Sequence, residues 1–141
     1  TSVFYFSYWL FGLEWYERGY PVIIDIFNES EYINTVLITI SFIPLIITGI
    51  SFVSIFVFKN RKLQMKLTQL GFRLSLVMSL FTIFYFYNCL SYLTELMPSK
   101  FLELLMYAAI VNPFLCCYLL FLALKYIKRD NELINSLDRI R

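Results

Sequence analysis

Histidine is absent from the sequence, and charged residues are scarce. Charged residues make up 16% of the 141 residues, whereas an ordinary soluble domain has about 25%. The lack of histidine excludes bis-histidine haem ligation, histidine-based acid–base catalysis and a Ser-His-Asp triad. Hydrophobic residues make up 60% of the chain and aromatic residues 20%, more than a soluble domain of this size can bury. A lipid bilayer accommodates this much apolar surface, so the composition predicts a membrane protein.

Cysteine is also rare, and its spacing predicts neither a disulfide framework nor a metal site. Cys89, Cys116 and Cys117 all lie in apolar stretches, and none of them forms a C-x-x-C spacing. We interpret them as small buried apolar side chains. The acids Glu95 and Glu103 have no evident catalytic partner. The sequence therefore predicts no catalytic, cofactor-binding or metal-binding residues, and we expect the protein not to be an enzyme.

Three long stretches contain no charged residue, namely 35–58, 74–93 and 104–124. About 20 residues of helix cross a hydrocarbon core of roughly 30 Å. In lipid, a helix satisfies its own backbone hydrogen bonds, which an open strand does not. The pattern predicts an all-α fold: a multi-pass transmembrane helical bundle with three full spans, forming a single transmembrane domain over residues 1–141.

The beginning of the chain is also uncharged over residues 1–13, but this stretch is too short to cross a membrane. We expect it to be the outer end of a fourth, N-terminal helix whose cytoplasmic start precedes Thr1. The alternative is an interfacial segment, because tyrosine and tryptophan favour the headgroup region. Residues 14–34 are then expected to form an outer loop. The aromatic residues expected near the outer interface are Trp9, Trp15, Tyr16 and Tyr20.

Basic residues are concentrated in two segments. Of the twelve lysine and arginine residues, ten lie in 59–73 or in 125–141. By the positive-inside rule these two segments are cytoplasmic, and the segments 14–34 and 94–103 are then outside. Each span reverses the side of the membrane, so this assignment agrees with the helix count.

Small and polar residues inside the spans indicate contacts between helices. Gly71, Ser75 and Ser79 are spaced four apart, so they share one helix face, and small residues let membrane helices approach closely. We interpret them as a helix-packing face; chance spacing is the alternative. Asn112, which precedes Pro113 near the centre of the last span, is interpreted as an intramembrane polar contact to another helix. Its alternative role is in a ligand or ion site.

Proline marks two places where a helix is expected to bend. Pro44 and Pro113 both lie mid-span, and each removes a backbone N–H donor. No acidic or basic residue lies deep in a predicted span. This pattern argues against a proton pump, a proton-coupled transporter and an intramembrane protease.

A basic link precedes the second full span and contains Lys59, Arg61, Lys62 and Lys66. We interpret these residues as determinants of membrane topology; attraction to an anionic leaflet is the alternative. Nucleic acid is not expected as a partner, because the basic cluster is small and lies against the membrane.

The C-terminal segment, 125–141, has an amphipathic pattern typical of a helix. Its apolar stripe consists of Ile127, Ile134, Leu137 and Ile140. Such a face lies on the membrane surface or docks in a groove of a partner protein, and the sequence leaves both possibilities open.

Two cytoplasmic segments carry motifs. Residues 56–66 contain N-R-K-L-Q at 60–64, and residues 123–141 contain D-N-E-L followed by D-R-I-R. Both motifs resemble those of a bacterial integral-membrane family catalogued as domain of unknown function 4293. The resemblance implies four helices, the first of which begins near the start of the protein. It implies no activity, ligand or catalytic residue.

These features lead to two hypotheses. The first is a non-enzymatic accessory or scaffold subunit of a bacterial inner-membrane protein complex, with the lipid bilayer and other membrane subunits as partners and no cofactor. It rests on the helix-packing face and the amphipathic C-terminal segment, both of which could serve partners. The alternative is a small transporter or lipid-binding membrane protein, with a cavity shaped by Asn112, Pro113 and Pro44.

Overall fold

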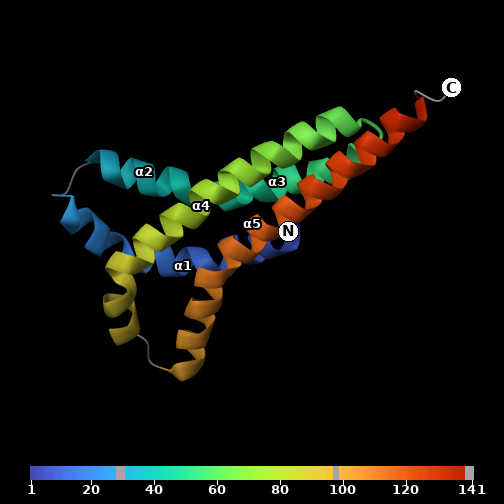
Figure 1. The fold of residues 1–141 in the computed structure, drawn as a ribbon. Coiled ribbons are helices and arrows are strands. Elements are labelled where there is room, and N and C mark those ends of the chain that lie inside the picture. Colours follow the sequence, from blue (N-terminus) through green and yellow to red (C-terminus); the bar gives the residue numbers. More distant parts are fainter. Residues whose placement is uncertain (28–30, 97–98, 139–141) are drawn as a thin grey trace.

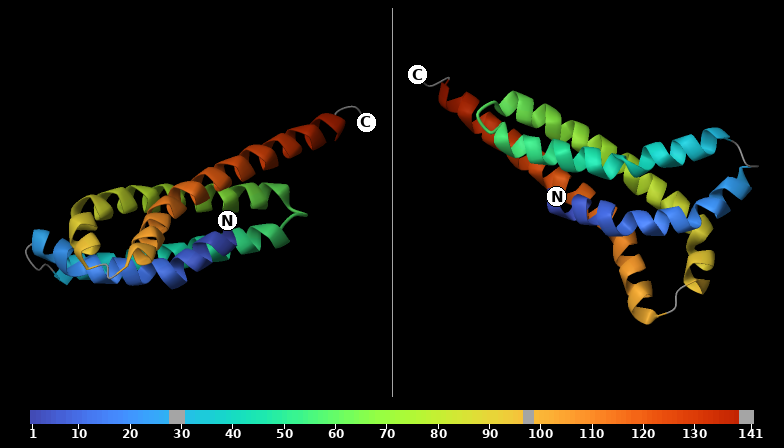
Figure 2. Two further views of the ribbon diagram at one scale, coloured as in Figure 1. Left: turned by 90° about the horizontal axis from the view of Figure 1, so that it is seen from below. Right: turned by 180° about the vertical axis from the view of Figure 1, so that it is seen from behind.

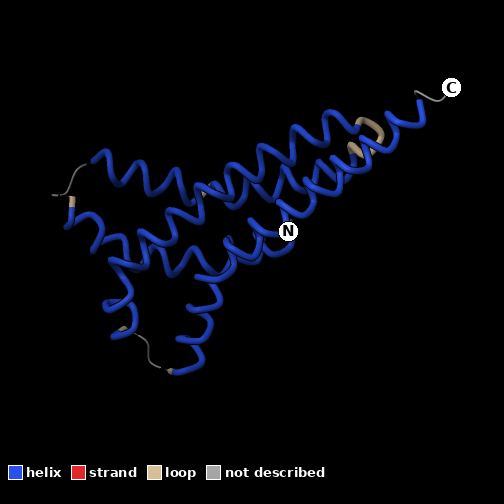
Figure 3. Tube along the Cα trace, in the orientation of Figure 1, coloured by secondary structure: helices blue, strands red, loops and turns tan. Residues whose placement is uncertain are grey.

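The protein is a bundle of long helices. The computed structural model describes residues 1–27, 31–96 and 99–138, and within these ranges the chain forms five α-helices and no strand (Figures 1 and 3). The side chains at 11, 13–15, 31, 135, 137 and 138 are not described. The expected all-α fold is confirmed. The helices are α1 (Ser2–Ile26), α2 (Glu31–Ser41), α3 (Ile43–Phe56), α4 (Arg61–Glu95) and α5 (Lys100–Asp138).

The helices α1, α3, α4 and α5 pack side by side. Helix α4 lies against both α3 and α5, and α1 contacts α3, α4 and α5. Helix α2 extends the line of α3 at one end of the bundle (Figure 2). The C-terminal part of α4 and the N-terminal part of α5 turn away from the bundle together (Figure 1). The core therefore lies where α1 crosses α3, α4 and α5.

Three segments are long and apolar enough to cross a membrane: Tyr32–Phe56, Arg61–Glu95 and Lys100–Ile134. Each coincides with one of the charge-free stretches, and the second and third extend well past the charge-free residues. Lysine, arginine and glutamate are good helix formers, so a charge ends the apolar part of a span without ending the helix. The three predicted full spans agree with these helices.

The first of these segments is not one straight helix. It consists of α2 and α3, which are separated at Phe42, and Pro44 lies in the first turn of α3. Proline is compatible with the first turn of a helix because the N–H that it lacks has no intrahelical acceptor there. Pro44 therefore helps to separate two helices, whereas Pro113 remains inside α5.

The expected outer loop over 14–34 is wrong. Apart from Phe27, the described residues in this range are helical, because α1 continues to Ile26. Tyr16 and Ile23 are buried against the bundle. The charged side chains on the other side of this part of α1 are exposed, and they are Glu17, Arg18 and Asp25. The segment is an amphipathic helix, which a search for charge-free length does not detect.

The predicted basic link, 59–73, is mostly helix. Only 57–60 lie between α3 and α4, so residues 61–73 form the first turns of α4. The side chain of Asn60 caps this helix, because its oxygen accepts a hydrogen bond from the backbone N–H of Leu63 at 3.2 Å. The link is therefore a short turn followed by a capped helix.

Helix α5 is much longer than a membrane crossing requires. It has 39 residues, which corresponds to about 58 Å at 1.5 Å per residue, about twice the thickness of a hydrocarbon core. The segment after residue 124 continues the spanning helix without a break, and its end extends beyond the other helices (Figure 1).

Candidate functional site

The basic link and the C-terminal part of α5 meet at one end of the bundle. A guanidinium nitrogen of Arg61 lies 3.9 Å from the Oδ2 atom of Asp130. The same guanidinium donates a hydrogen bond to the side-chain oxygen of Gln64 at 3.3 Å. Asn60 caps α4 one residue earlier. Residues of the two sequence motifs therefore contact each other, although they are far apart in the sequence.

Polar side chains continue from this junction into the space between α3 and α4. The amide nitrogen of Gln64 donates to the backbone oxygen of Ser54 at 3.2 Å, and the hydroxyl oxygens of Ser54 and Thr68 lie 3.2 Å apart. A cavity of about 210 Å³ lies beside these residues and is also bordered by Ser51, Leu120 and Ile127. The Ser51 hydroxyl is buried and has no hydrogen-bond partner among the described residues. Both polar and apolar side chains line this cavity, which borders the junction through Gln64.

The lysines of the basic link face away from the bundle. Lys59, Lys62 and Lys66 are all exposed, whereas Arg61 is partly covered by its contact with Asp130. Exposed cations next to a membrane-spanning segment lie at the level of lipid headgroups. Arg61 therefore pairs within the chain, whereas Lys59, Lys62 and Lys66 are exposed to groups outside it.

The predicted helix-packing face is buried inside the chain. Gly71, Ser75 and Ser79 are all buried along α4. A Cβ atom added at Gly71 would lie 3.6 Å from Ile50 and 3.9 Å from Leu120, so this glycine lies where α3 and α5 approach α4. The face therefore packs against helices of the same protein.

Asn112 joins α5 to α1. Its amide nitrogen donates to the backbone oxygen of Phe4 at 3.1 Å, and its side-chain oxygen accepts from the Cys116 thiol at 3.2 Å. Pro113 is fully buried beside it. Asn112 is thus placed as a contact between helices. Pro44 lines a pocket together with residues of α1, α2 and α4. Neither Asn112 nor Pro113 lines this pocket.

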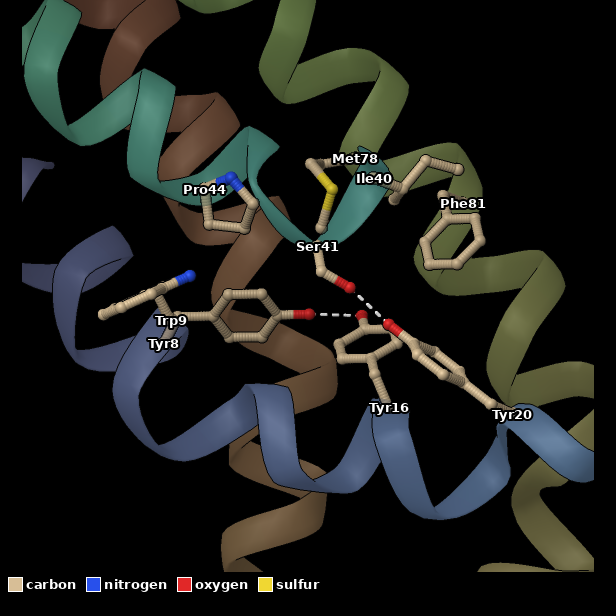
Figure 4. A pocket seen from close by; sticks show the side chains of 9 residues that line it. All are labelled: Tyr8, Trp9, Tyr16, Tyr20, Ile40, Ser41, Pro44, Met78 and Phe81. Atoms are coloured by element: carbon tan, nitrogen blue, oxygen red, sulfur yellow. Dashed lines mark hydrogen bonds between the residues drawn. The ribbon is translucent and has the colours of Figure 1, made fainter. Parts of the chain in front are cut away.

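That pocket contains a cluster of tyrosines that the charge-free stretches do not predict (Figure 4). Tyr8 donates a hydrogen bond to the hydroxyl of Tyr16, and the Tyr16 hydroxyl lies 3.0 Å from the Thr82 hydroxyl. Tyr85 donates to the backbone oxygen of Tyr16 at 2.8 Å. Tyr20 is hydrogen-bonded to Ser41 at the end of α2. Tyrosine hydroxyls therefore connect α1 to α2 and α4.

The expected position of Tyr16 and Tyr20 near the outer interface stays a prediction, and in the bundle both hydroxyls contact other helices. Tyr16 is 4% exposed and stacks on Phe81, with ring centroids 5.7 Å apart. The side chain of Trp15 lies outside the described residues. The free space in the pocket is about 10 Å³, which is too small for a ligand. The cluster is a packed core in which every named hydroxyl has a partner.

A signal for this core was present in the sequence. The buried positions of α1 recur at steps of three and four residues, which is the periodicity of one helix face. They are Tyr5, Tyr8, Gly12, Tyr16, Gly19 and Ile23. The residue type of tyrosine favours an interfacial position, whereas this spacing predicts a buried helix face.

The fold defines a multi-pass α-helical membrane protein in which polar side chains connect the helices. The chain belongs to the family described as "Domain of unknown function (DUF4293)", whose sequence pattern matches residues 10–140. No match to the chain was found among curated proteins or among solved structures. In the motifs that indicated this family, Asn60, Arg61, Gln64 and Asp130 make the junction contacts given above. The last motif residues, 139–141, lie outside the described residues.

Proposed function

We propose that the protein is a non-enzymatic accessory or scaffold subunit of a bacterial inner-membrane protein complex, and that the end of α5 is its attachment point. The observation that carries this proposal is the projection of α5 past every other helix (Figure 1). The face formed by Gly71, Ser75 and Ser79 does not support this proposal, because it is buried against other helices of the same chain.

The projecting part of α5 presents apolar side chains among charged ones. Leu133 is 56% exposed and Ile134 is 44% exposed, and the neighbouring Arg129 and Glu132 are exposed as well. Of the other members of the apolar stripe, Ile127 borders the cavity beside Ser51, whereas the side chain of Leu137 and all of Ile140 lie outside the described part of the chain. A partly apolar helix face of this kind is suited to a groove on another protein.

The direction of α5 favours a protein partner over the membrane surface. A surface-bound amphipathic helix lies in the plane of the interface, whereas this segment continues in line with the spanning part of the same helix (Figure 2). A helix of about 58 Å extends out of a hydrocarbon core of roughly 30 Å. In this proposal the end of α5 therefore extends out of the lipid.

The orientation that we propose follows the basic residues. Lys59, Lys62 and Lys66 are exposed at the same end of the bundle as Lys125 and Lys128. By the positive-inside rule this end faces the cytoplasm. The attachment point would then be offered to the cytoplasmic parts of other membrane subunits.

The test is purification of the tagged full-length protein in a mild detergent, with mass spectrometry of the chains that accompany it. The double substitution Leu133→Gln with Ile134→Gln is expected to remove the partners. The matched control changes two exposed polar residues of the same segment, Arg129→Gln with Glu132→Gln. A single monodisperse species in every mild detergent, or equal partner recovery from both variants, contradicts the proposal.

A second candidate function, that of a small transporter, is favoured by the cavity beside Ser51. The cavity combines about 210 Å³ of space with the Ser51, Ser54 and Gln64 side chains, and a buried hydroxyl without a partner is suited to a polar solute. The test is Ser51→Cys in a variant whose three native cysteines are replaced by alanine, with Ser75→Cys as the buried control. Labelling of position 51 by an impermeant maleimide from both sides of a vesicle supports transport, and labelling from one side or neither contradicts it.

A further inference from the structure

An apolar groove of about 440 Å³ runs between α4 and α5. Among the side chains that line it are Phe72, Leu76 and Leu80 of α4 and Phe114, Tyr118 and Phe121 of α5. Leu80 is 68% exposed and Tyr118 is 59% exposed, so the groove opens to the surroundings of the bundle. Because both helices are long and apolar enough to cross a membrane, we expect those surroundings to be lipid. A void there would lose dispersion contacts, and a flexible acyl chain is the neighbouring molecule that fits such a slot.

Two contacts fix the antiparallel register of α4 and α5 at the basic end of this groove. The rings of Phe72 and Phe121 meet there with centroids 6.1 Å apart. Further along both helices, Arg61 and Asp130 lie 3.9 Å apart. The stretch between these two contacts begins where the groove ends. It is the place where the headgroup of a lipid seated in the groove would lie.

The cations of α5 in this stretch follow the face that lines the groove. Lys125 comes four residues after Phe121 and Lys128 comes seven residues after it, and such positions share one helix face. Both lysines are exposed. The nearest acid on this helix, Asp130, is already paired with Arg61. Glu132 lies four residues after Lys128, but neither lysine forms an ion pair with an acid among the described residues, so both ammonium groups can meet an anionic group outside the protein.

Helix α4 adds cations on its own side of the groove. Arg73 comes three residues before Leu76 and seven before Leu80, so it borders the groove-lining face, and it is exposed. Lys62 and Lys66 lie in the stretch between the ring contact and the ion pair, and both are exposed. A slot for an acyl chain thus ends in positive charge contributed by both helices.

We propose that this face of α4 and α5 is a binding site for a phospholipid with an anionic headgroup. One acyl chain occupies the groove, and the phosphate lies in the stretch beyond it, beside Lys125 and Lys128 of α5 and Lys66 of α4. Charge complementarity selects the headgroup, because the apolar groove accepts the chains of neutral and anionic lipids alike. The site is separate from the projecting residues Leu133 and Ile134, so its failure leaves the proposed subunit role intact.

The experiment uses the full-length protein in mild detergent, incubated with equal amounts of phosphatidylglycerol and phosphatidylcholine, and native mass spectrometry to count the retained lipids. The wild type is expected to retain phosphatidylglycerol in preference. Lys125→Gln is expected to reduce that preference about 5-fold, and Lys125→Gln with Lys128→Gln about 25-fold. Lys59→Gln removes an exposed lysine at the same end but off the groove, and it is expected to leave the preference unchanged.

Two further variants separate the groove from the headgroup contacts. Leu80→Trp fills the groove and is expected to reduce retention of both lipids, whereas Val77→Trp places the same side chain on α4 outside the groove lining and serves as its control. Lys125→Arg with Lys128→Arg keeps the charge and is expected to restore the preference. Equal retention of the two lipids by the wild type, or equal effects of Lys125→Gln and Lys59→Gln, overturns the proposal.

Discussion

The phenol oxygen of Tyr5 on α1 lies 2.6 Å from the hydroxyl oxygen of Ser75 on α4, and both side chains are fully buried. These residues are 70 positions apart in the sequence. A hydrogen bond between two buried hydroxyls satisfies both polar groups without water, which the interior of a membrane bundle does not supply. Ser75 is thereby part of the contact between α1 and α4, and its small side chain lets the tyrosine reach it.

Removing this hydrogen bond is expected to weaken the bundle. Tyr5→Phe should lower the free energy of unfolding by about 0.5–1.5 kcal/mol, since the Ser75 hydroxyl is left without this partner. The control is Tyr126→Phe, which removes an exposed hydroxyl. A double-mutant cycle of Tyr5→Phe and Ser75→Ala, measured by unfolding in detergent, gives the coupling energy of the two hydroxyls. A coupling of zero would show that the two hydroxyls do not interact.

Gly19 is expected to tolerate no side chain. A Cβ atom at this position would lie 2.8 Å from Cζ of Tyr85 and 3.3 Å from Cβ of Cys89, and Tyr85 is itself held by its bond to the Tyr16 backbone oxygen. Gly19→Ala should therefore destabilise the fold by about 1–3 kcal/mol. In contrast, nothing lies within 4 Å of a Cβ at Gly49, so Gly49→Ala should be neutral or stabilising by up to about 1 kcal/mol. Thermal unfolding of the two variants in one detergent compares them directly.

At the junction, the cap of α4 is expected to contribute more than the ion pair. Asn60→Ala leaves the Leu63 N–H without its side-chain acceptor and should cost about 1 kcal/mol. Arg61 and Asp130 are 3.9 Å apart with side chains 36% and 54% exposed, so solvent screens their attraction. Their coupling energy in a double-mutant cycle should be about 0.5 kcal/mol or less and should decrease as salt is added. A coupling above the cost of Asn60→Ala would reverse this ranking.

Asn112 is expected to act through stability. Asn112→Leu removes the bond to the Phe4 backbone oxygen that joins α5 to α1 and should lower the free energy of unfolding by about 1 kcal/mol. Asn88→Leu is the comparison, because Asn88 donates to Phe84 of its own helix at 2.7 Å and has no hydrogen bond to a second helix within the described ranges. If Asn112→Leu abolished a transport or binding activity while stability stayed unchanged, the role of Asn112 would be in a ligand site.

The sequence was sufficient for the number and type of the long helices. Charge-free stretches of at least 20 residues predicted three spans, and the helical segments Tyr32–Phe56, Arg61–Glu95 and Lys100–Ile134 contain most of them. This prediction depends on length and polarity, which are local properties of the chain. The same criterion failed for α1 after residue 13, because an amphipathic helix buries one face and keeps its charges on the other.

Such local patterns do not predict which distant residues contact each other. The spacing of Gly71, Ser75 and Ser79 indicated a packing face, but only the tertiary structure decided that α1, α3 and α5 of the same chain occupy it. Similarly, the motif residues Arg61 and Asp130 were each visible in the sequence, and only the register of α4 against α5 brought them together.

The amino-acid sequence by itself determined that the protein is an all-α membrane protein with three long spans and a basic end, because hydrocarbon requires long apolar helices that satisfy their own backbone. The tertiary structure decided which polar side chains meet. The pairing of the tyrosines of α1 with Ser41, Ser75 and Thr82, and the alignment of the α4–α5 groove with its lysines, depend on helix rotation and register. These quantities are set by the packing of side chains from several helices at once.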